Sequence, residues 1–329
     1  MSSSNASNWL RNGVSPSTVG IPANTHLSAI EFLAQRFPAI PREVWLQRFL
    51  EGGIFNAKGV NITPDQSLLG ETHLRYFRHV ANEPALPFKA QIIFQDENLV
   101  VADKPHFMPV TPGGQYVQQS LLVQLKQQLN LPELSPIHRI DRETAGLVMF
   151  SVRAQDRDAY QALFRLRQVE KTYEAIAGRP ESSPVRPKFP LTHKSKIVEA
   201  AQFFKMRELS ADDMADGEVL NSETWIDCVE RIEARGLSLQ TNTAPLEELA
   251  RYVLKPVTGQ RHQLRVHMNA LGLPLVGDPF YPMVKRAAEE TDDFSEALQL
   301  LAKTITFKDP LTGILRTFES RQQLMPPAS

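Results

Sequence analysis

The sequence predicts an α+β fold in which the central sheet is mixed but largely antiparallel and carries helices on its flanks. Strand-like runs at 92–94 and 99–102 are separated by a short polar turn rather than by a crossover helix. Strand and helix patterns then alternate without the regular rhythm of a parallel α/β protein. A hairpin near the C-terminus, predicted for 304–307 and 314–318 around a turn with Pro and Gly, indicates the same class.

Composition divides the chain of 329 residues into two domains with short extensions. Residues 1–25 are rich in Ser, Asn and Pro, which predicts a flexible arm. Residues 26–81 show two helical patterns followed by short extended segments, and 82–87 form a Pro-containing linker. The larger domain is predicted over 88–320, with a C-terminal tail at 321–329.

The larger domain should contain further helices and strands. Apolar spacing predicts helices at 120–129, at about 156–167, and around Phe294, Ala297, Leu298 and Leu301. Apolar runs predict strands at 147–152, 171–177, 225–229 and 252–254. Thr258 is a candidate N-cap for one more helix, whose buried stripe would be Leu264, Met268 and Leu271.

Composition excludes several classes of protein. With 42% hydrophobic and 22% charged residues the chain is an ordinary globular protein, and no apolar run is long enough to cross a bilayer. A net charge of −1 argues, on average, against a nucleic-acid binder. The single cysteine excludes a disulfide framework and a multi-cysteine zinc site. No secretory signal pattern is visible, so we expect a cytoplasmic protein. We also expect it to act as a monomer.

The first candidate for chemistry is Asp141, which lies between Arg139 and Arg142 directly before a predicted buried strand. The two cations should keep this carboxylate ionised, and an ionised carboxylate at a strand end can serve as a nucleophile or a base. A surface cluster of ion pairs would give the same pattern, and from these residues alone it is the more common explanation.

A second candidate segment contains Arg261 and Arg265, one helical turn apart at the start of a predicted helix. Arginines there oppose the helix dipole, a cost that makes sense where the helix start faces an anion or a carboxylate. An amphipathic helix with solvated arginines is the alternative. Lys171 and Tyr173 share one face of a predicted strand, where the tyrosine either contacts a base or is a half-buried core residue.

Histidines give no metal site by their spacing. His138, His262 and His267 have no carboxylate or cysteine at a recognised ligand spacing, so we expect no metal. The glycine pair at 113–114 belongs to no phosphate-loop pattern.

Together these motifs resemble those of the RluA-type pseudouridine synthases, in the order of that family and over 88–320. The matching segments are Asp-Glu-Asn-Leu-Val-Val-Ala-Asp-Lys-Pro at 96–105, His-Arg-Ile-Asp at 138–141, Thr-Ala-Gly-Leu at 144–147, Lys-Thr-Tyr at 171–173, Thr-Gly-Gln-Arg-His-Gln-Leu-Arg-Val-His at 258–267 and Gly-Leu-Pro-Leu-Val-Gly-Asp-Pro-Phe-Tyr at 272–281. Gln260 stands where the family usually has an arginine. The resemblance favours a functional Asp141 over an ion-pair cluster.

The resemblance implies an activity without a metal or an organic cofactor. Members of the family detach uracil from the ribose of a uridine in RNA, rotate it and rejoin it through C5. By this resemblance, Asp141 is the catalytic carboxylate and Arg265 is its ion-pair partner. Tyr173 would pack on the uracil and help with the C5 proton, and Arg139 would help to displace the target base.

The resemblance also implies contacts with RNA. Lys104, Arg142 and Arg261 are expected at phosphates, which position RNA without specifying its sequence, and Lys171 and His262 are expected among the RNA-binding residues. The substrate is expected to be ribosomal or transfer RNA. The segment 26–81 resembles a small S4-like RNA-binding domain. A non-catalytic RNA-binding or ribosome-assembly factor on the same fold is the alternative function.

Acidic residues are segregated along the chain. The segment 208–248 holds eleven acids against two arginines, and five more acids lie in 289–296. The rest of the chain, with every motif above, keeps 34 basic and 21 acidic residues. We therefore predict a basic cleft, with the acidic segments on surfaces turned away from RNA.

Overall fold

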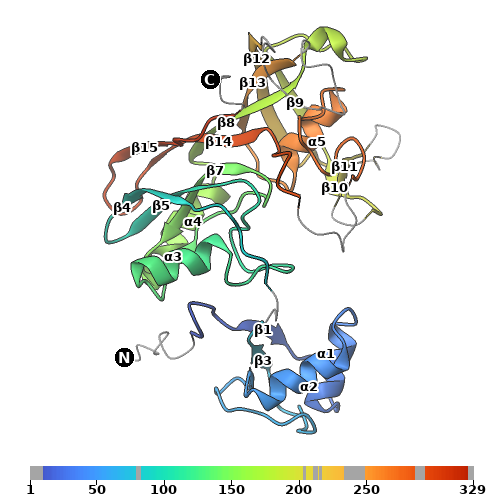
Figure 1. Ribbon diagram of the computed structural model, residues 1–329, viewed down its shortest axis with the longest axis vertical. Coiled ribbons are helices and arrows are strands. Elements are labelled where there is room, and N and C mark those ends of the chain that lie inside the picture. Colours follow the sequence, from blue (N-terminus) through green and yellow to red (C-terminus); the bar gives the residue numbers. More distant parts are fainter. Residues whose placement is uncertain are drawn as a thin grey trace. The chain divides into compact units, whose positions relative to one another are not determined.

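The computed structural model of the chain describes residues 10–78, 83–202, 205–209, 214, 217–232, 249–285 and 293–324. The chain divides into two compact units (Figure 1). The N-terminal unit comprises Met1–Ala85 with Pro112–Glu133, and the larger unit comprises Leu86–Thr111 with Leu134–Ser329. All the motif segments quoted above lie in the larger unit.

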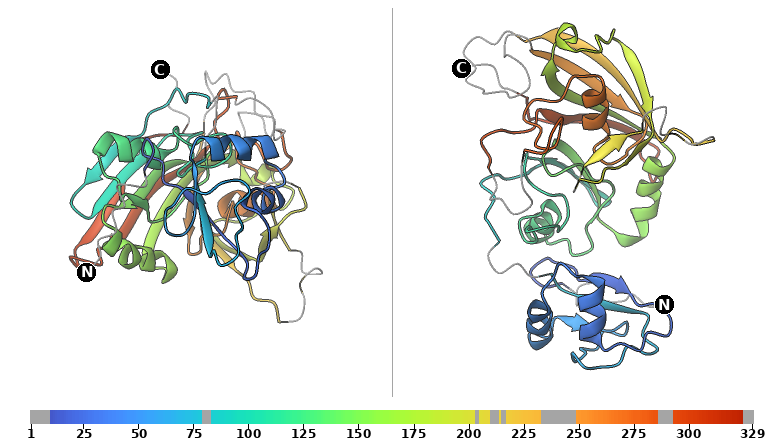
Figure 2. Two further views of the ribbon diagram at one scale, coloured as in Figure 1. Left: turned by 90° about the horizontal axis from the view of Figure 1, so that it is seen from below. Right: turned by 90° about the vertical axis from the view of Figure 1, so that its right-hand side faces the viewer.

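The N-terminal unit is a small α/β unit, seen from two further sides in Figure 2. Its sheet has the order β1 (Ser17–Gly20), β3 (His73–Tyr76) and β2 (Ile54–Phe55), with antiparallel pairs. Its helices are α1 (Ala29–Arg36), α2 (Arg42–Leu50) and α3 (Leu121–Leu129). Ser28 caps α1 in a reciprocal arrangement with Glu31, and Trp45 is fully buried in the core. That this unit is S4-like stays a prediction.

The arm predicted over 1–25 differs from the structure at β1, which pairs with β3 along its full length. Val19 is buried in this strand, whereas Thr18 and Gly20 are exposed. One buried apolar residue among Ser, Thr and Gly is too short an alternation to be recognised in a sequence.

The larger unit is built on a ten-stranded sheet. Its central path runs β4-β5-β7-β14-β8-β13-β12-β9, and β15 and β6 pair with β14 and β7. Among the pairs described, only β14 with β7 is parallel, so the predicted mixed and largely antiparallel sheet is confirmed. The strands are β4 (Gln91–Gln95), β5 (Leu99–Lys104), β6 (Ser135–Pro136), β7 (Ala145–Ser151), β8 (Val169–Gly178), β9 (Leu191–Ser195), β12 (Ser222–Arg231), β13 (Leu249–Pro256), β14 (Leu300–Lys308) and β15 (Leu315–Glu319).

Smaller elements surround this sheet. A separate antiparallel hairpin joins β10 (Ile197–Glu199) to β11 (Met206–Glu208), beside α5 (Gln263–Ala270) (Figure 1). The remaining elements are α4 (Arg157–Arg165) and two short 3₁₀ helices, Ala154–Asp156 and Pro180–Ser182.

Helices α4 and α5 cover neighbouring parts of one face of the sheet. Side chains of a strand alternate between its faces, so the odd-numbered residues of β8 share a face. Val169 packs in a core that contains residues of α4, whereas Ala175 and Ala177 pack in a core that contains residues of α5. Lys171 and Tyr173 are also odd-numbered, and they therefore project from the stretch of β8 between the two helices. This arrangement places the predicted pair at the floor of a cleft.

Two sequence predictions of helical structure were wrong. The helix expected around Phe294 and Leu301 is absent, because Leu298 and Leu300 are buried by sheet packing and β14 already begins at Leu300. Thr258 does not cap α5, which begins at Gln263 after His262 takes a left-handed φ of 56°.

Parts of both acidic segments lie outside the described residues, since 210–213, 215–216, 233–248 and 286–292 are not among them. The prediction about where these segments face therefore stays a prediction. Among the described helices, none has the length and apolar content needed to cross a bilayer.

Candidate active site

A cleft in the larger unit is lined by residues of four of the six motif segments, 138–141, 144–147, 171–173 and 258–267. It encloses about 500 Å³ of space, part of it open solvent. The lining consists of Arg139, Ile140, Asp141, Thr144, Lys171, Tyr173, Pro256, Thr258, Gly259, Gln260, His262, Gln263, Leu264, Arg265 and Leu300. The structure thus brings together the predicted catalytic residues Asp141, Tyr173 and Arg265.

The loop that carries Asp141 is fixed at both ends. At its start, His138 Nε2 accepts the backbone N–H of Met149 (3.1 Å), and its ring stacks on Phe164 with a centroid separation of 4.6 Å. Burial, together with the nearby Lys171 cation, lowers the pKa of His138 to about 3, so the ring is neutral and can accept this bond. At its end, the N–H of Thr144 donates to the Asp141 carbonyl, which closes a turn directly before β7.

Gly146 lets β14 approach this loop. Its φ is 110°, and an added Cβ would lie 2.3 Å from the carbonyl oxygen of Ala302. In β14, Leu301 and Ala302 pair with Ala145 and Gly146 in the parallel register. The small residue therefore allows the end of the Asp141 loop to join the sheet beside β14.

Arg265 lies between two carboxylates and is fully buried. Its Nη1 donates to Asp141 Oδ2 (3.2 Å), while its Nε and Nη2 donate to Asp278 Oδ2 (2.8 Å) and Oδ1 (2.6 Å). Asp278 Oδ1 also accepts the N–H groups of Phe280 (2.8 Å) and Tyr281 (3.1 Å). This pair fixes the guanidinium plane, so its third nitrogen is aimed at Asp141.

The charge of Arg265 is maintained by these acids. Burial alone would lower the pKa of Arg265, but Asp278 first, then Asp141 and Glu143, raise it above its ordinary value. Glu143 lies 3.9 Å from Nη1. The site therefore holds a permanent cation against Asp141, whose side chain is 25% exposed and so remains open to the cleft.

Lys171 and Tyr173 rise from β8 beside Asp141, as their common strand face predicts. Burial lowers the pKa of Lys171 to about 8, and its Nζ donates to the Thr258 carbonyl (3.3 Å). Burial, with a smaller contribution from the Asp141 charge, raises the pKa of Tyr173, so its phenol stays protonated at neutral pH.

His262 contacts the same carboxylate from the helix side. Its Nε2 lies 4.0 Å from Asp141 Oδ2, and its Nδ1 lies 3.1 Å from the Tyr281 hydroxyl. Burial, then the Arg265 and Arg261 cations, lower the pKa of His262 to about 3. The neutral imidazole is therefore a hydrogen-bonding group at the cleft rather than a charged contact for phosphate.

Two of the residues predicted to contact RNA lie outside the cleft lining. Lys104 is fully buried, and its Nζ donates to the carbonyls of Pro105 (2.9 Å) and Arg142 (3.0 Å). Arg142 is half-buried, and its Nε donates to the Phe107 carbonyl (2.9 Å). Neither residue lines the cleft, because their position at the root of the Asp141 loop directs them to backbone carbonyls. Both support the loop from within the protein.

Two of the other predicted contacts, Arg139 and Arg261, are exposed. Arg139 is exposed and lines the cleft. Arg261 is exposed but lies outside the lining, 3.8 Å from a carboxylate oxygen of Glu199. Thus Arg261 does not share a side of α5 with Arg265, because it precedes the helix. The charged groups of the lining are Arg139, Lys171, Arg265 and Asp141. Asp278 and Glu143 lie next to Arg265 outside the lining, so the basic cleft stays a prediction.

Sequence reasoning missed Asp278 and Tyr281 as site residues. Both lie in the quoted segment 272–281, so the signal was present, but neither spacing nor charge pattern shows that this segment reaches Arg265. Gly277 makes the approach possible, since its φ is 70° and an added Cβ would lie 2.2 Å from the Ala297 carbonyl.

Comparison with known proteins agrees with this geometry. Residues 98–270, more than half of the chain, match the family described as RNA pseudouridylate synthase. An uncharacterized RNA pseudouridine synthase of Synechocystis is 27% identical over 274 residues, which cover 80% of this chain and 84% of that protein. The dual-specificity RNA pseudouridine synthase RluA of Haemophilus influenzae is 31% identical, over 73% of this chain and 96% of that protein.

Solved structures show the same fold. The human RNA pseudouridylate synthase domain containing 4 has a TM-score of 0.50 at 25% identity, over 71% of this chain and 88% of that one. The human RNA pseudouridylate synthase domain containing 1 has a TM-score of 0.54 at 20% identity, over 73% and 86%. These findings support the enzyme over a non-catalytic RNA-binding factor. The chain belongs to the RNA pseudouridylate synthase family and is an isomerase that makes pseudouridine in RNA.

Proposed function

We propose that Asp141 is the catalytic carboxylate of this enzyme and that its substrates are uridines of ribosomal or transfer RNA. The observation that carries the proposal is the contact between Asp141 and the buried Arg265 in a cleft whose floor holds Tyr173. The Asp141 side chain is 25% exposed, whereas its partner Arg265 is fully buried, so the carboxylate can reach a substrate in the cleft.

The reaction breaks the bond between uracil N1 and ribose C1′ and forms a bond between C5 and C1′. The proton at C5 leaves and N1 gains one, so substrate and product have the same atoms. Asp141 acts at the sugar, either by attacking it or by removing a proton from it. Arg265 orients the Asp141 carboxylate, because Asp278 fixes the position of the guanidinium.

Tyr173 has two roles in this proposal. Its ring packs on the uracil once the base has left the RNA stack. Because burial raises the pKa of Tyr173, it enters the reaction as a neutral phenol. The Tyr173 hydroxyl therefore relays the C5 proton: its oxygen accepts that proton while its own proton leaves.

The cations at the cleft bind the RNA backbone and help to displace the target base. Arg139, exposed at the lining, takes the space of the flipped nucleotide. Lys171 and the exposed Arg261 contact the RNA backbone, which positions the strand without reading its sequence. His262 donates or accepts a hydrogen bond at the substrate as a neutral ring.

Carbodiimide-based mapping of pseudouridine tests the proposal. Ribosomal and transfer RNA from a strain lacking the protein should each be compared with RNA from the parent, and the missing positions identified. Wild-type protein should restore them in vitro. Asp141→Asn should not restore them, while it still folds and binds the RNA.

Asp158→Asn is the matched control, because Asp158 is an exposed carboxylate on α4. It should behave as wild type. Full activity of Asp141→Asn would refute the assignment of Asp141, and unchanged ribosomal and transfer RNA in the deletion strain would refute these substrates.

A further inference from the structure

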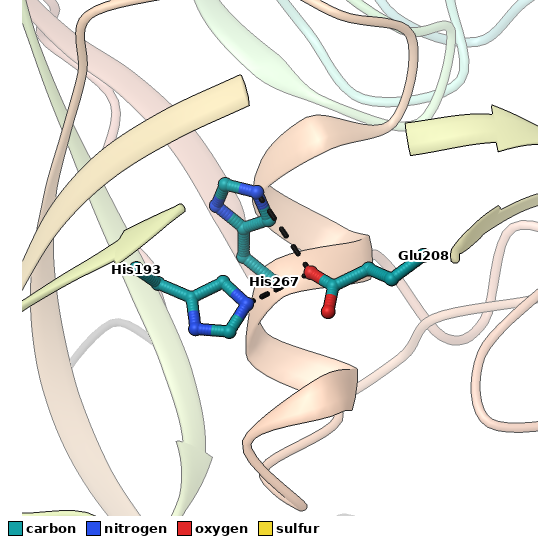
Figure 3. Close-up of side chains that lie close together, drawn as sticks. All are labelled: His193, Glu208 and His267. Atoms are coloured by element: carbon teal, nitrogen blue, oxygen red, sulfur yellow. Dashed lines mark hydrogen bonds and ion pairs between the residues drawn. The ribbon is translucent and has the colours of Figure 1, made fainter. Parts of the chain in front are cut away.

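Two histidines and a glutamate meet outside the cleft lining, in the larger unit. His193 lies on β9, Glu208 on β11 and His267 on α5, and Figure 3 shows all three side chains pointing toward one another. Glu208 Oε1 lies 2.9 Å from His193 Nε2 and 3.9 Å from His267 Nε2. Each side chain has one ligand atom within 4.8 Å of the other two, a grouping found among the described residues nowhere else.

We propose that His193, Glu208 and His267 bind a zinc ion that fastens β9 and the β10–β11 hairpin to α5. Two imidazole nitrogens and one carboxylate oxygen are a donor set that suits zinc. Ligands about 2.0–2.2 Å from a tetrahedral ion lie about 3.4 Å from one another. The separations of 2.9 and 3.9 Å lie on either side of that value, so small side-chain rotations complete the site.

Burial differs between the three ligands in a way that suits an ion entering from solvent. The side chain of His267 is fully buried, whereas those of His193 and Glu208 are 22% and 19% exposed. Solvent therefore reaches the site from the His193 and Glu208 side, and water can fill the fourth position.

Hydroxyl groups around His267 orient its ring. Its Nδ1 lies 2.9 Å from Thr224 Oγ1, the type of contact that fixes a metal-binding histidine from its far side. Its Nε2 lies 3.0 Å from Ser222 Oγ and 3.2 Å from Ser195 Oγ. When Nε2 turns to the metal, Ser222 keeps a partner, because its hydroxyl donates to the Ser195 carbonyl (2.7 Å).

The alternative is a metal-free cluster in which His267 is satisfied by these hydroxyls and His193 pairs with Glu208. The two arrangements differ in what zinc does to the protein. An ion pair needs no zinc, whereas a metal site is stabilised by zinc, increasingly so as the free zinc concentration rises above its Kd.

The site is connected to the cleft lining through the hairpin, but it does not contact the substrate. In β11, the N–H of Met206 donates to the Tyr281 hydroxyl (2.9 Å), and that hydroxyl contacts His262 in the cleft lining. Zinc therefore stabilises the packing of β9 and the β10–β11 hairpin against α5, and catalysis persists when zinc is removed.

Zinc titration of the full chain tests this proposal. The tag-free protein is treated with a chelator, dialysed and titrated with zinc chloride by calorimetry, while thermal unfolding is followed with and without zinc. We expect one equivalent to bind and the unfolding midpoint to rise. Cobalt(II) in the same site should give the visible absorption of a tetrahedral complex.

His193→Ala and Glu208→Gln each remove one ligand at a partly exposed position and should weaken zinc binding about tenfold or more, with the circular dichroism of the protein unchanged. His73→Ala removes a histidine from β3 of the N-terminal unit and should bind as wild type. If wild type binds no stoichiometric zinc, or if both ligand variants bind zinc as wild type does, the cluster is an ion pair only and the proposal is wrong. Either result leaves the assignment of Asp141 untouched.

Discussion

Arg265 gives two nitrogens to Asp278 and one to Asp141, although Asp141 is the residue that faces the cleft. The contact with Asp278 is shorter, at 2.6 and 2.8 Å against 3.2 Å, and it is fully buried. Asp278 therefore sets the position of the guanidinium, and Asp141 receives a cation that is already oriented.

We predict that Asp278→Asn lowers kcat tenfold or more while the Kd for RNA changes little. The substitution leaves Arg265 buried with less compensating charge, which also destabilises the fold by about 3–5 kcal/mol. Single-turnover kinetics and thermal unfolding measure the two effects.

Asp309→Asn provides the matched control for Asp278→Asn. Asp309 is equally buried, pairs with Arg316 Nε (2.8 Å), and accepts two backbone N–H groups as Asp278 does. It lies outside the cleft lining. This variant should lose similar stability but keep kcat below its unfolding temperature. Equal kcat values for the two variants would contradict the positioning role of Asp278.

We predict that Lys104→Met lowers kcat and stability but leaves the salt dependence of RNA binding unchanged. Lys104 is fully buried, and its loss leaves the carbonyls of Pro105 and Arg142 without that donor, at a cost of about 1–3 kcal/mol. Arg139→Ala, by contrast, should raise the KM for RNA with little loss of stability. A reduced salt slope in Lys104→Met would show that Lys104 contacts phosphate after all.

We predict that RNA affinity falls between pH 7 and 9 because Lys171 loses its charge. Burial lowers the pKa of Lys171 to about 8, so the amine is mostly protonated at pH 7 and mostly neutral at pH 9. Binding is measured in an Asp141→Asn background, which prevents turnover. Lys171→Met should bind weakly throughout and lack this fall. If it retains the same pH dependence, another group is responsible.

We predict that Gly146→Ala destabilises the larger unit by about 3 kcal/mol or more. The added methyl would lie 2.3 Å from the Ala302 carbonyl at a φ of 110°, so β7 and β14 must separate. Gly20→Ala is the control, because its methyl meets nothing within 4 Å. Urea unfolding measures both, and equal midpoints would show that the sheet absorbs the clash.

Local patterns predicted much of the fold. The predicted strand at 171–177 corresponds to β8, the predicted terminal hairpin to β14 and β15, and the predicted helix at 120–129 to α3. The helix expected around Phe294 was wrong because apolar spacing in a short segment does not distinguish a helix from a chain buried against a sheet. Thr258 does not act as a cap, because its hydroxyl donates to the side-chain oxygen of Gln263. The same oxygen accepts the Gln260 N–H.

The sequence alone determined the family, the position of Asp141 before a buried strand, and the common face of Lys171 and Tyr173, because motif order and side-chain alternation are local properties. Only the tertiary structure decided that Lys104 is a buried support and that Asp278 holds Arg265. The same is true of the group His193, Glu208 and His267. These contacts join residues far apart in the chain, and they depend on strand register and helix docking. Both are set by packing of the whole unit, which leaves no periodic signal in the sequence.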